Sequence, residues 1–197
     1  MSYRVFIGSS RESLEYAEEI QRNLENARIP DMEPVCWPTI FQLGSYTLES
    51  LLSALKRSTF GVFVLAPDDF VEIRNETYRI PRDNVILEMG MFIAGVGREN
   101  TFFVKPQDTG EYRLRLPTDL DGVTGASYAS HLYDNNIAAK VSSACVQIKN
   151  SIREQLIIKM DSAEGYGEKK QSAVTSTSTD KKNFQERLKE YQKLITK

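Results

Sequence analysis

The stretch Phe60-Gly61-Val62-Phe63-Val64-Leu65-Ala66-Pro67-Asp68-Asp69 determines the class of fold. Its first part, Phe60–Ala66, is a continuous run of apolar residues and glycine, and the run stops abruptly at Pro67. A short apolar run that ends in turn residues is typical of a strand buried on both faces, as in the middle of a parallel sheet. We therefore expect Phe60–Ala66 to be a central strand with helices on both sides.

Strands and helices are expected to alternate along the rest of the chain. The other expected strands lie at residues 3–8, 33–37 and 101–104, with Val123 in a short fifth strand. Apolar residues three or four apart predict helices at about residues 12–27, 48–55, 84–97 and 136–159. Ser9 and Glu12 have the spacing of a capping box for the first helix. This alternation predicts an α/β fold, a flavodoxin-like doubly wound parallel sheet of about five strands.

Ligands of such sheets bind at the carboxyl ends of the strands, near the switch between the first and third strands. The rule selects Gly8-Ser9-Ser10-Arg11, the loop after Trp37 with Phe41, and Asp68-Asp69. The first segment is compatible with a phosphate cradle or with a plain helix cap. The two aromatic residues are suited to stacking on a ligand ring or to core packing. The two aspartates are suited to a ligand hydroxyl, to a metal ion, or only to a turn.

One charge interrupts the apolar segment DNVILEMGMFIAG at residues 83–95. Past Asn84 the expected helix is apolar nearly all round, so we expect it to be buried with Glu88 inside. A buried carboxylate is costly unless it is paired, protonated or part of a functional pocket. Asn84 lies one turn before Glu88, and Arg82 lies at the helix start. The pattern alone leaves open a functional carboxylate, one paired with a buried arginine, or one at the rim of the core.

Composition narrows the class of protein. The formal net charge is −2, so no basic excess favours nucleic acid or an anionic membrane as a partner. Cys36 and Cys145 are far apart and lack CxxC spacing, which argues against a disulfide or zinc site and fits a reducing cytoplasm. His131 is the single histidine and nothing marks it as catalytic, so the sequence gives no basis for a Ser-His or Cys-His dyad. With no signal peptide and no apolar run long enough to span a membrane, we expect a soluble cytoplasmic protein.

The chain is expected to divide into three parts. Residues 1–159 contain the alternating elements and should form the folded domain. Residues 160–180 are polar and rich in Ser, Thr, Gly and Lys, which predicts a flexible linker. Residues 181–197 have apolar residues four, three and four apart, which predicts a short amphipathic helix. That helix is suited to docking on its own domain or to contacting another subunit.

Four segments occur in an order that identifies a family. They are VFIGSS at 5–10, VLAPDD at 64–69, PRDNVILEMG at 81–90 and LPTDLDGV at 116–123. Together they resemble the bacterial TIR-like family (Toll/interleukin-1 receptor-like, predicted nucleotide-binding), over residues 1 to about 157. The third motif is the most specific. The departures are Met89, where Leu is common, and Thr118, where Ser is common, and neither removes a functional group.

The resemblance implies a TIR-like fold, NAD⁺ glycohydrolase activity and a role as an effector of antiphage defence, with Glu88 as the catalytic residue. NAD⁺ is then the substrate, and neither a cofactor nor a metal is required. We expect Gly8, Ser9, Ser10 and Arg11 to hold the diphosphate, and Trp37 or Phe41 to stack on a ring. Asp68 is a further candidate ligand residue, and Arg82 and Asn84 would order the entrance. The product would be ADP-ribose or a cyclic form.

The resemblance also implies regulation. A homo-oligomer is expected to gate activity, and a nucleotide second messenger or a separate sensor protein is the expected trigger. The alternative from another class is a non-catalytic module that binds a nucleotide and acts as a TIR scaffold in signalling. An electron carrier or a phosphoacceptor receiver fits less well, since the chain has no flavin loop pattern and the segment around Glu88 would have no role.

Overall fold

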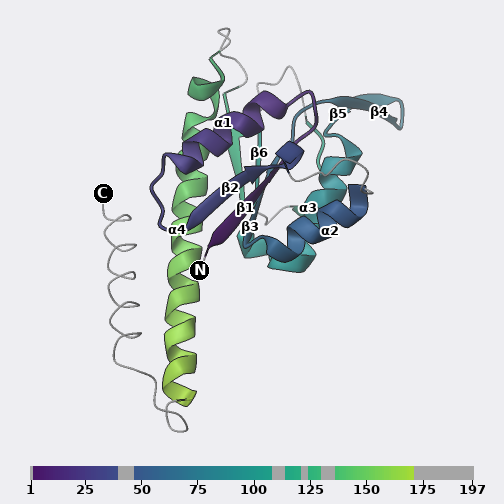
Figure 1. The fold of residues 1–197 in the computed structure, drawn as a ribbon. Helices are drawn as coiled ribbons and strands as arrows, with labels where there is room; N and C mark the ends of the chain where they lie inside the picture. Colours follow the sequence, from purple (N-terminus) through teal and green to yellow (C-terminus); the bar gives the residue numbers. More distant parts are fainter. Residues whose placement is uncertain (1, 40–46, 108–113, 121–123, 130–135, 171–197) are drawn as a thin grey trace. The chain divides into compact units, whose positions relative to one another are not determined.

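The computed structural model describes residues 2–39, 47–107, 114–120, 124–129 and 136–170. Its main sheet has five parallel strands in the order β2-β1-β3-β6-β7 (Figure 1). These strands are β1 (Tyr3–Gly8), β2 (Met32–Cys36), β3 (Phe60–Val64), β6 (Thr101–Pro106) and β7 (Thr124–Tyr128). The chain leaves β1 toward one edge and returns toward the other at β3, so the predicted doubly wound α/β fold is confirmed.

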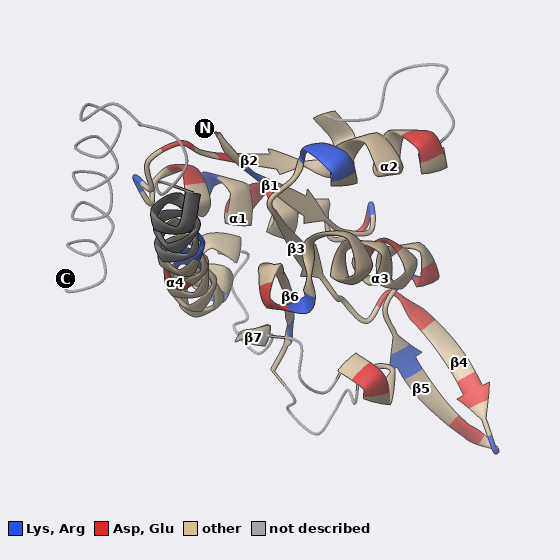
Figure 2. Cartoon of the chain, turned by 90° about the horizontal axis from the view of Figure 1, so that it is seen from below, with Lys and Arg blue, Asp and Glu red and all other residues tan. Residues whose placement is uncertain are grey.

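Helices cover both faces of this sheet. They are α1 (Leu14–Glu25), α2 (Thr47–Arg57), α3 (Asp83–Val96) and α4 (Ile137–Lys170), with short 3₁₀ turns at Trp37–Thr39, Arg98–Asn100 and Thr118–Leu120. Figure 2 shows α1 on one face of the sheet, with α2 and α3 side by side on the other. The chain forms two compact units, residues 1–148 and 149–197. The sheet and the candidate site belong to the first.

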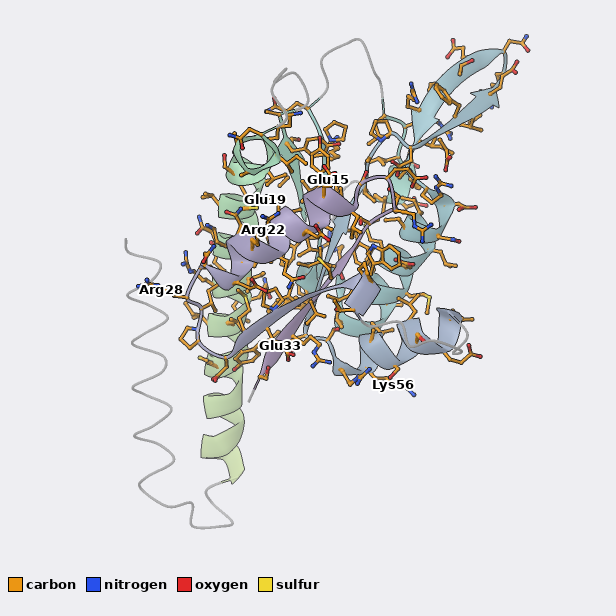
Figure 3. The ribbon with its side chains drawn as sticks, turned by 45° about the horizontal axis from the view of Figure 1, so that its top comes forward. Glu15, Glu19, Arg22, Arg28, Glu33 and Lys56 are labelled. Atoms are coloured by element: carbon orange, nitrogen blue, oxygen red, sulfur yellow. The ribbon has the colours of Figure 1, made fainter. Side chains whose placement is uncertain are left out.

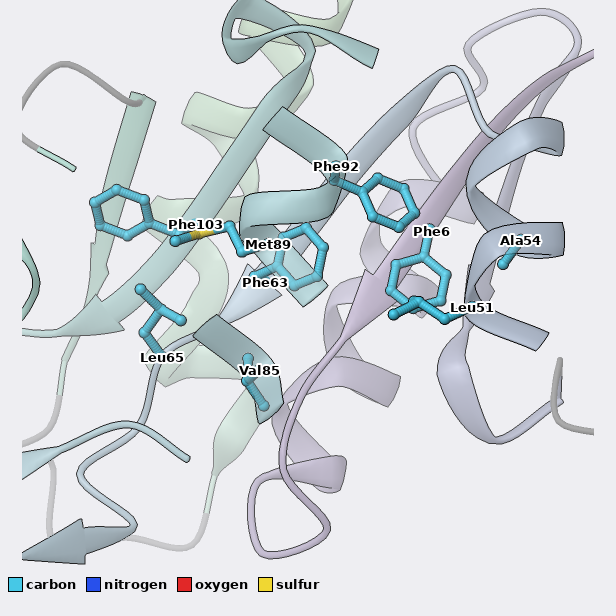
Figure 4. Close-up of a cluster of buried hydrophobic side chains, with 9 residues drawn as sticks. All are labelled: Phe6, Leu51, Ala54, Phe63, Leu65, Val85, Met89, Phe92 and Phe103. Carbon is cyan, nitrogen blue, oxygen red and sulfur yellow. The ribbon is translucent and has the colours of Figure 1, made fainter. Parts of the chain in front are cut away.

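The core between the sheet and the α2–α3 pair is rich in phenylalanine (Figure 4). The ring of Phe92 on α3 lies 4.7 Å from that of Phe6 and 5.3 Å from that of Phe63, centroid to centroid. Gly61 makes this approach possible, because a Cβ atom there would lie 2.7 Å from the Phe92 ring. The remaining members of the cluster are Leu51, Ala54, Leu65, Val85, Met89 and Phe103. This packing fixes the position of α3, which carries Glu88.

A hairpin occupies the segment that was expected to be a loop after Asp69. It consists of β4 (Asp69–Ile73) and β5 (Glu76–Ile80), which pair antiparallel. Arg74 and Asn75 at its tip have φ of 53° and 64°, as in the two-residue turns that match the twist of a hairpin. Apolar and charged residues alternate along Val71-Glu72-Ile73, and this alternation is the sequence pattern that could have predicted the first strand of the hairpin. Figure 2 shows the hairpin extending away from the sheet.

Three further expectations were wrong. The capping box of Ser9 and Glu12 does not form, because α1 begins at Leu14 with Ser13 as its N-cap residue. Helix α3 is not buried all round, since only Val85, Met89 and Phe92 are fully covered and Leu87 is 59% exposed. The expected linker is helical over residues 160–170, because α4 continues to Lys170.

The structure also bears on composition. Both cysteines are unbridged and buried, Cys36 on β2 and Cys145 on α4. In the part of the chain that is described, no helix has the length and apolar character to cross a bilayer. Phe41, Val123 and the expected C-terminal helix at 181–197 lie outside the described residues.

Candidate functional site

The carboxyl ends of β1 and β3 bring together residues from the three segments selected by the fold. The indole Nε1 of Trp37 donates a hydrogen bond to Ser9 Oγ at 3.2 Å. The hydroxyl of Ser13 donates to Asp68 Oδ1 at 3.4 Å. Ser9 and Ser10 are themselves buried, whereas Arg11 is exposed. The predicted meeting point of Ser9, Trp37 and Asp68 at the switch between strands is therefore present.

The hydroxyl groups of Ser9 and Ser10 already take part in hydrogen bonds within the protein. Ser9 Oγ donates to the carbonyl oxygen of Ser10 at 2.9 Å, and Ser10 Oγ accepts from the N–H of Ser13 at 3.2 Å. Gly8 ends β1 against the Phe63 ring, which would lie 2.8 Å from a Cβ atom at that position. A ligand at this loop would therefore meet backbone groups and Arg11 before it met the serine hydroxyls.

Asp68 has one carboxylate oxygen with no partner. Burial raises the pKa of Asp68, and the Glu12 carboxylate raises it further, while hydrogen bonds from Ser10 and Ser13 and the charge of Arg82 lower it. Its Oδ2 atom is buried and accepts no hydrogen bond from the described residues. The side chain thus offers an unused acceptor at the strand switch.

Arg82 joins the start of α3 to two other elements. Its Nη2 lies 2.7 Å from Glu12 Oε1, ahead of α1, and its Nε lies 3.1 Å from Asp69 Oδ2 at the start of β4. The expected position of Arg82 at the start of α3 is confirmed, since Arg82 is the N-cap residue of that helix. Its guanidinium is engaged by these two carboxylates, so it orders the segments around the switch.

Glu88 is half-buried on α3 and stands apart electrostatically. Burial alone raises its pKa from an ordinary 4.5 to about 7. Among the described residues it forms no hydrogen bond and no ion pair. The structural alternative, a carboxylate paired with a buried arginine, therefore has no support in the described part of the chain.

The direction of Glu88 follows from helix geometry. A Cβ atom at Gly95 would lie 2.8 Å from the side chain of Leu55, so that flank of α3 faces α2. Glu88 precedes Gly95 by two helical turns and lies on the same flank, with Asn84 one turn further back. Asn84 is exposed. Glu88 is thus at the border between the core and the surface, on the flank of α3 that faces α2 at Gly95.

Within the described residues, Glu88 is linked to the strand switch through the hydrophobic core. Trp37 packs against the hydrophobic cluster that contains Val85 and Met89 of α3, the neighbours of Glu88 on its helix. No contact among the described residues joins the Glu88 carboxylate itself to Ser9 or Asp68. Within the same residues, no three His, Cys, Asp or Glu side chains are grouped to hold a metal ion.

Two tyrosines near Asp68 were not predicted. Burial raises the pKa of Tyr128, and the neighbouring Tyr16 and Asp68 raise it further. The rings of Tyr16 and Tyr128 lie 4.8 Å apart, centroid to centroid. Because they come from α1 and β7, which are distant in the sequence, no local pattern pointed to them. The pair lies close enough to Asp68 for that carboxylate to act on the Tyr128 hydroxyl.

Comparison with known proteins gives one family. The family profile described as "CAP12/Pycsar effector protein, TIR domain" matches residues 4–130. Pycsar effector protein PaPycTIR of Pseudomonas aeruginosa is 35% identical over 148 residues, 75% of this chain and 46% of its own length. CD-NTase-associated protein 12 of Sphingobacterium faecium is 33% identical over 72% of this chain and 41% of its own length. The protein of the same name from Flavobacterium daejeonense is 38% identical over 63% of this chain and 37% of its own length. The chain thus spans less than half the length of these relatives.

Proposed function

Because the chain belongs to the TIR-domain family of CAP12 and Pycsar effectors, we propose that it hydrolyses the nicotinamide–ribose bond of NAD⁺, with Glu88 as the catalytic residue. The products are nicotinamide and ADP-ribose, or a cyclic form of ADP-ribose. The proposal includes an effector role in antiviral defence. The names of the relatives refer to Pycsar and to CD-NTase association, which supports a nucleotide second messenger as the trigger.

The environment of Glu88 carries the proposal. It is a carboxylate with a pKa raised to about 7, half-buried at the edge of the core and without a partner among the described residues. A structural carboxylate in such a place would be expected to have a cationic partner, because burial of an unpaired charge is costly. Groups whose pKa is strongly shifted are enriched at functional sites.

A single carboxylate is sufficient for this reaction. The scissile bond joins ribose C1′ to a positively charged pyridinium nitrogen, so nicotinamide leaves as a neutral molecule and no acid has to protonate it. Ordinary glycosidases need a second carboxyl group for that step. In the proposed mechanism, ionised Glu88 accepts hydrogen bonds from the ribose hydroxyls and stabilises the positive charge that develops on the ribose. Water then attacks C1′, or the adenine ring does so to give the cyclic product.

The other site residues bind the substrate in this proposal. Backbone N–H groups after Gly8, together with Arg11, hold the diphosphate. Trp37 stacks on a ring of NAD⁺, and the unused Oδ2 atom of Asp68 accepts a hydrogen bond from a hydroxyl group. Homo-oligomerisation is proposed to gate activity. Exposed Leu48 and Leu52 on α2 and Leu87 on α3 give that side of the molecule apolar surface for such contacts.

The test compares wild type with Glu88→Gln, which keeps the size of the side chain and removes its charge. We expect wild type, at high protein concentration and with a clustering agent, to release nicotinamide, and the variant to lose at least a hundredfold in rate. Glu154→Gln, an exposed glutamate on α4, is the matched control and should retain full activity. Equal turnover in wild type and Glu88→Gln would exclude Glu88 as the catalyst. Binding of NAD⁺ without turnover under every activating condition would favour the scaffolding role.

A further inference from the structure

A cavity lies between β5 of the hairpin and the carboxyl end of β6. Its volume is about 390 Å³. The lining consists of Tyr78 from β5, Lys105 from β6, and Leu114, Arg115, Leu116, Pro117 and Thr118. None of these seven residues is acidic. The function proposed above leaves this cavity without a role.

Backbone contacts hold the walls of the cavity together. Residue 114 forms a parallel β-bridge with Arg79, and the N–H of Arg115 donates to the carbonyl oxygen of Arg79 at 2.8 Å. This places the Arg115 guanidinium 5.7 Å from the centroid of the Tyr78 ring. Lys105 is held by the pairing of β6 with β7, where its register partner is Ser127. The walls of the cavity therefore come from strands β5 and β6 and from residues 114–118, and backbone pairing holds each of the three in place.

The two cations of the cavity have no carboxylate partner among the described residues. The four ion pairs in that part of the chain involve Arg4, Arg22 and Arg82, and neither Lys105 nor Arg115. Glu76, which lies beside the cavity on β5, already accepts a hydrogen bond from the Tyr78 hydroxyl. Among the described residues, Lys105 and Arg115 therefore bring two positive charges to the cavity and no carboxylate is paired with either.

The rest of the lining indicates which anion would fit. The Tyr78 ring, two leucines and Pro117 give the cavity an apolar side, while the Thr118 hydroxyl adds a hydrogen-bonding group. An arginine and a lysine that line the same cavity are typical of phosphate recognition. The volume is at the lower end for small-molecule sites, which suits a molecule with one ring system and a short anionic group.

From this combination we propose that the cavity between β5, β6 and residues 114–118 binds the phosphate end of a nucleotide, with Lys105 and Arg115 as its phosphate ligands. The ring or sugar of the nucleotide lies against Tyr78 and Pro117. Two sources share this chemistry, a free mononucleotide and the AMP half of NAD⁺, whose phosphate would then lie at Lys105 and Arg115 instead of at the Gly8–Arg11 loop. The site stands whether or not the protein hydrolyses NAD⁺, since its argument does not involve Glu88.

The experiment measures binding rather than turnover. Titration calorimetry measures the binding of AMP, and of NAD⁺ in a Glu88→Gln background. It compares the protein that retains Lys105 and Arg115 with the double variant Lys105→Gln/Arg115→Gln. The matched control is Lys56→Gln/Arg57→Gln, which removes the same two charge types from the end of α2, where Lys56 is labelled in Figure 3. A charge-preserving exchange, Lys105→Arg/Arg115→Lys, tests whether a loss comes from the charge or from disturbed folding.

We expect the Gln pair to weaken AMP binding at least tenfold, the control pair to leave it unchanged, and the charge-preserving pair to retain most of it. A tenfold loss for NAD⁺ as well identifies the substrate as the source, whereas a loss for AMP alone identifies a separate nucleotide. Binding of AMP that is equal in the Gln pair and the control pair overturns the site. So does the absence of saturable binding of either nucleotide to the protein with Lys105 and Arg115 intact.

Discussion

At the scale of single residues, the environment of Glu88 has the clearest consequences. Burial raises its pKa to about 7, so the side chain changes charge within the physiological range. The proposed mechanism needs the ionised form, because only a carboxylate stabilises the positive charge on the ribose. Catalysis and folding should therefore respond to pH in opposite directions through the same group.

We expect kcat/KM for NAD⁺ to rise about tenfold per pH unit below pH 7 and to level off above it. The reason is that kcat/KM follows the fraction of free enzyme in which Glu88 is ionised. The measurement is nicotinamide release between pH 5.5 and 8.5 at fixed ionic strength. A flat profile from pH 5.5 to 7 would mean that Glu88 ionises with an ordinary pKa or does not act in the reaction.

The same raised pKa means that ionised Glu88 lowers the free energy of unfolding. Its folded-state pKa is above the unfolded value of 4.5, so its contribution to stability is present below pH 4.5 and is lost as the pH rises to about 7. We expect Glu88→Gln to exceed wild type in free energy of unfolding by about 1–2 kcal/mol at pH 8, after allowing for partial solvation, and by less at pH 5. Urea unfolding at both pH values checks this, and Glu154→Gln should show no such trend.

Sequence reasoning found part of the site because part of it is local. Glu88 is one charge in an apolar helix, and Asp68 follows a buried strand, so both are visible in a short window. Exposure of Leu87 was not predicted, because apolar residues on three sides of a helix do not reveal which side lacks a covering element. Tyr16 and Tyr128 meet only after α1 and β7 have packed, and no local spacing encodes that.

At the scale of elements, the hairpin differs most from expectation. The segment after Asp69 has the alternating polarity of a strand. Its many polar residues, however, are equally typical of a loop when this segment is considered without its partner strand. What stabilises it is pairing, including Phe70 opposite Arg79, whose guanidinium lies 3.5 Å from the centroid of the Phe70 ring. Strand pairing is a property of two segments together, so neither one predicts the hairpin by itself.

The hairpin turn predicts a stabilising substitution. Arg74 has a φ of 53°, a left-handed conformation that costs a residue with a Cβ atom about 1 kcal/mol. Arg74→Gly removes this cost and should raise the free energy of unfolding by about 0.5–1 kcal/mol, whereas Arg74→Ala removes the same charge and retains the cost. Chemical unfolding of the two variants isolates the backbone effect. Equal stability of the two would contradict the turn geometry.

At the scale of the whole molecule, the order of the strands was predictable and the contacts between layers were not. Apolar runs separated by amphipathic segments impose parallel strands with helical crossovers, and right-handed crossovers leave few possible orders. The fit between Phe6, Phe63 and Phe92 depends on shape rather than on polarity. Residues 171–197 lie outside the described chain, so the short C-terminal helix stays a prediction.

The contact between the sheet and α3 predicts that alanine substitutions at Gly61 and Gly90 change the free energy of unfolding in opposite directions. Gly61→Ala places a Cβ atom 2.7 Å from the buried Phe92 ring, and we expect it to lower the free energy of unfolding by about 1–3 kcal/mol. Gly90→Ala, on α3, meets no atom within 4 Å and should raise it by up to about 1 kcal/mol, because alanine favours helix. Thermal unfolding of both variants checks the prediction. Similar destabilisation by both would contradict the packing described for α3.

The two unbridged, buried cysteines can report local unfolding of the elements that carry them. Burial and the nearby Glu18 and Glu25 raise the pKa of Cys36 to about 12, and Cys145 has no exposed surface. A thiol-exchange reagent at pH 8 therefore modifies these sulfurs at the rate at which β2 or α4 detaches, rather than at the rate of the chemistry. A single colorimetric time course of thiol modification would measure the detachment of β2 and of α4. A cysteine introduced on the surface would react before either buried thiol, so a label could be attached there without first replacing Cys36 and Cys145.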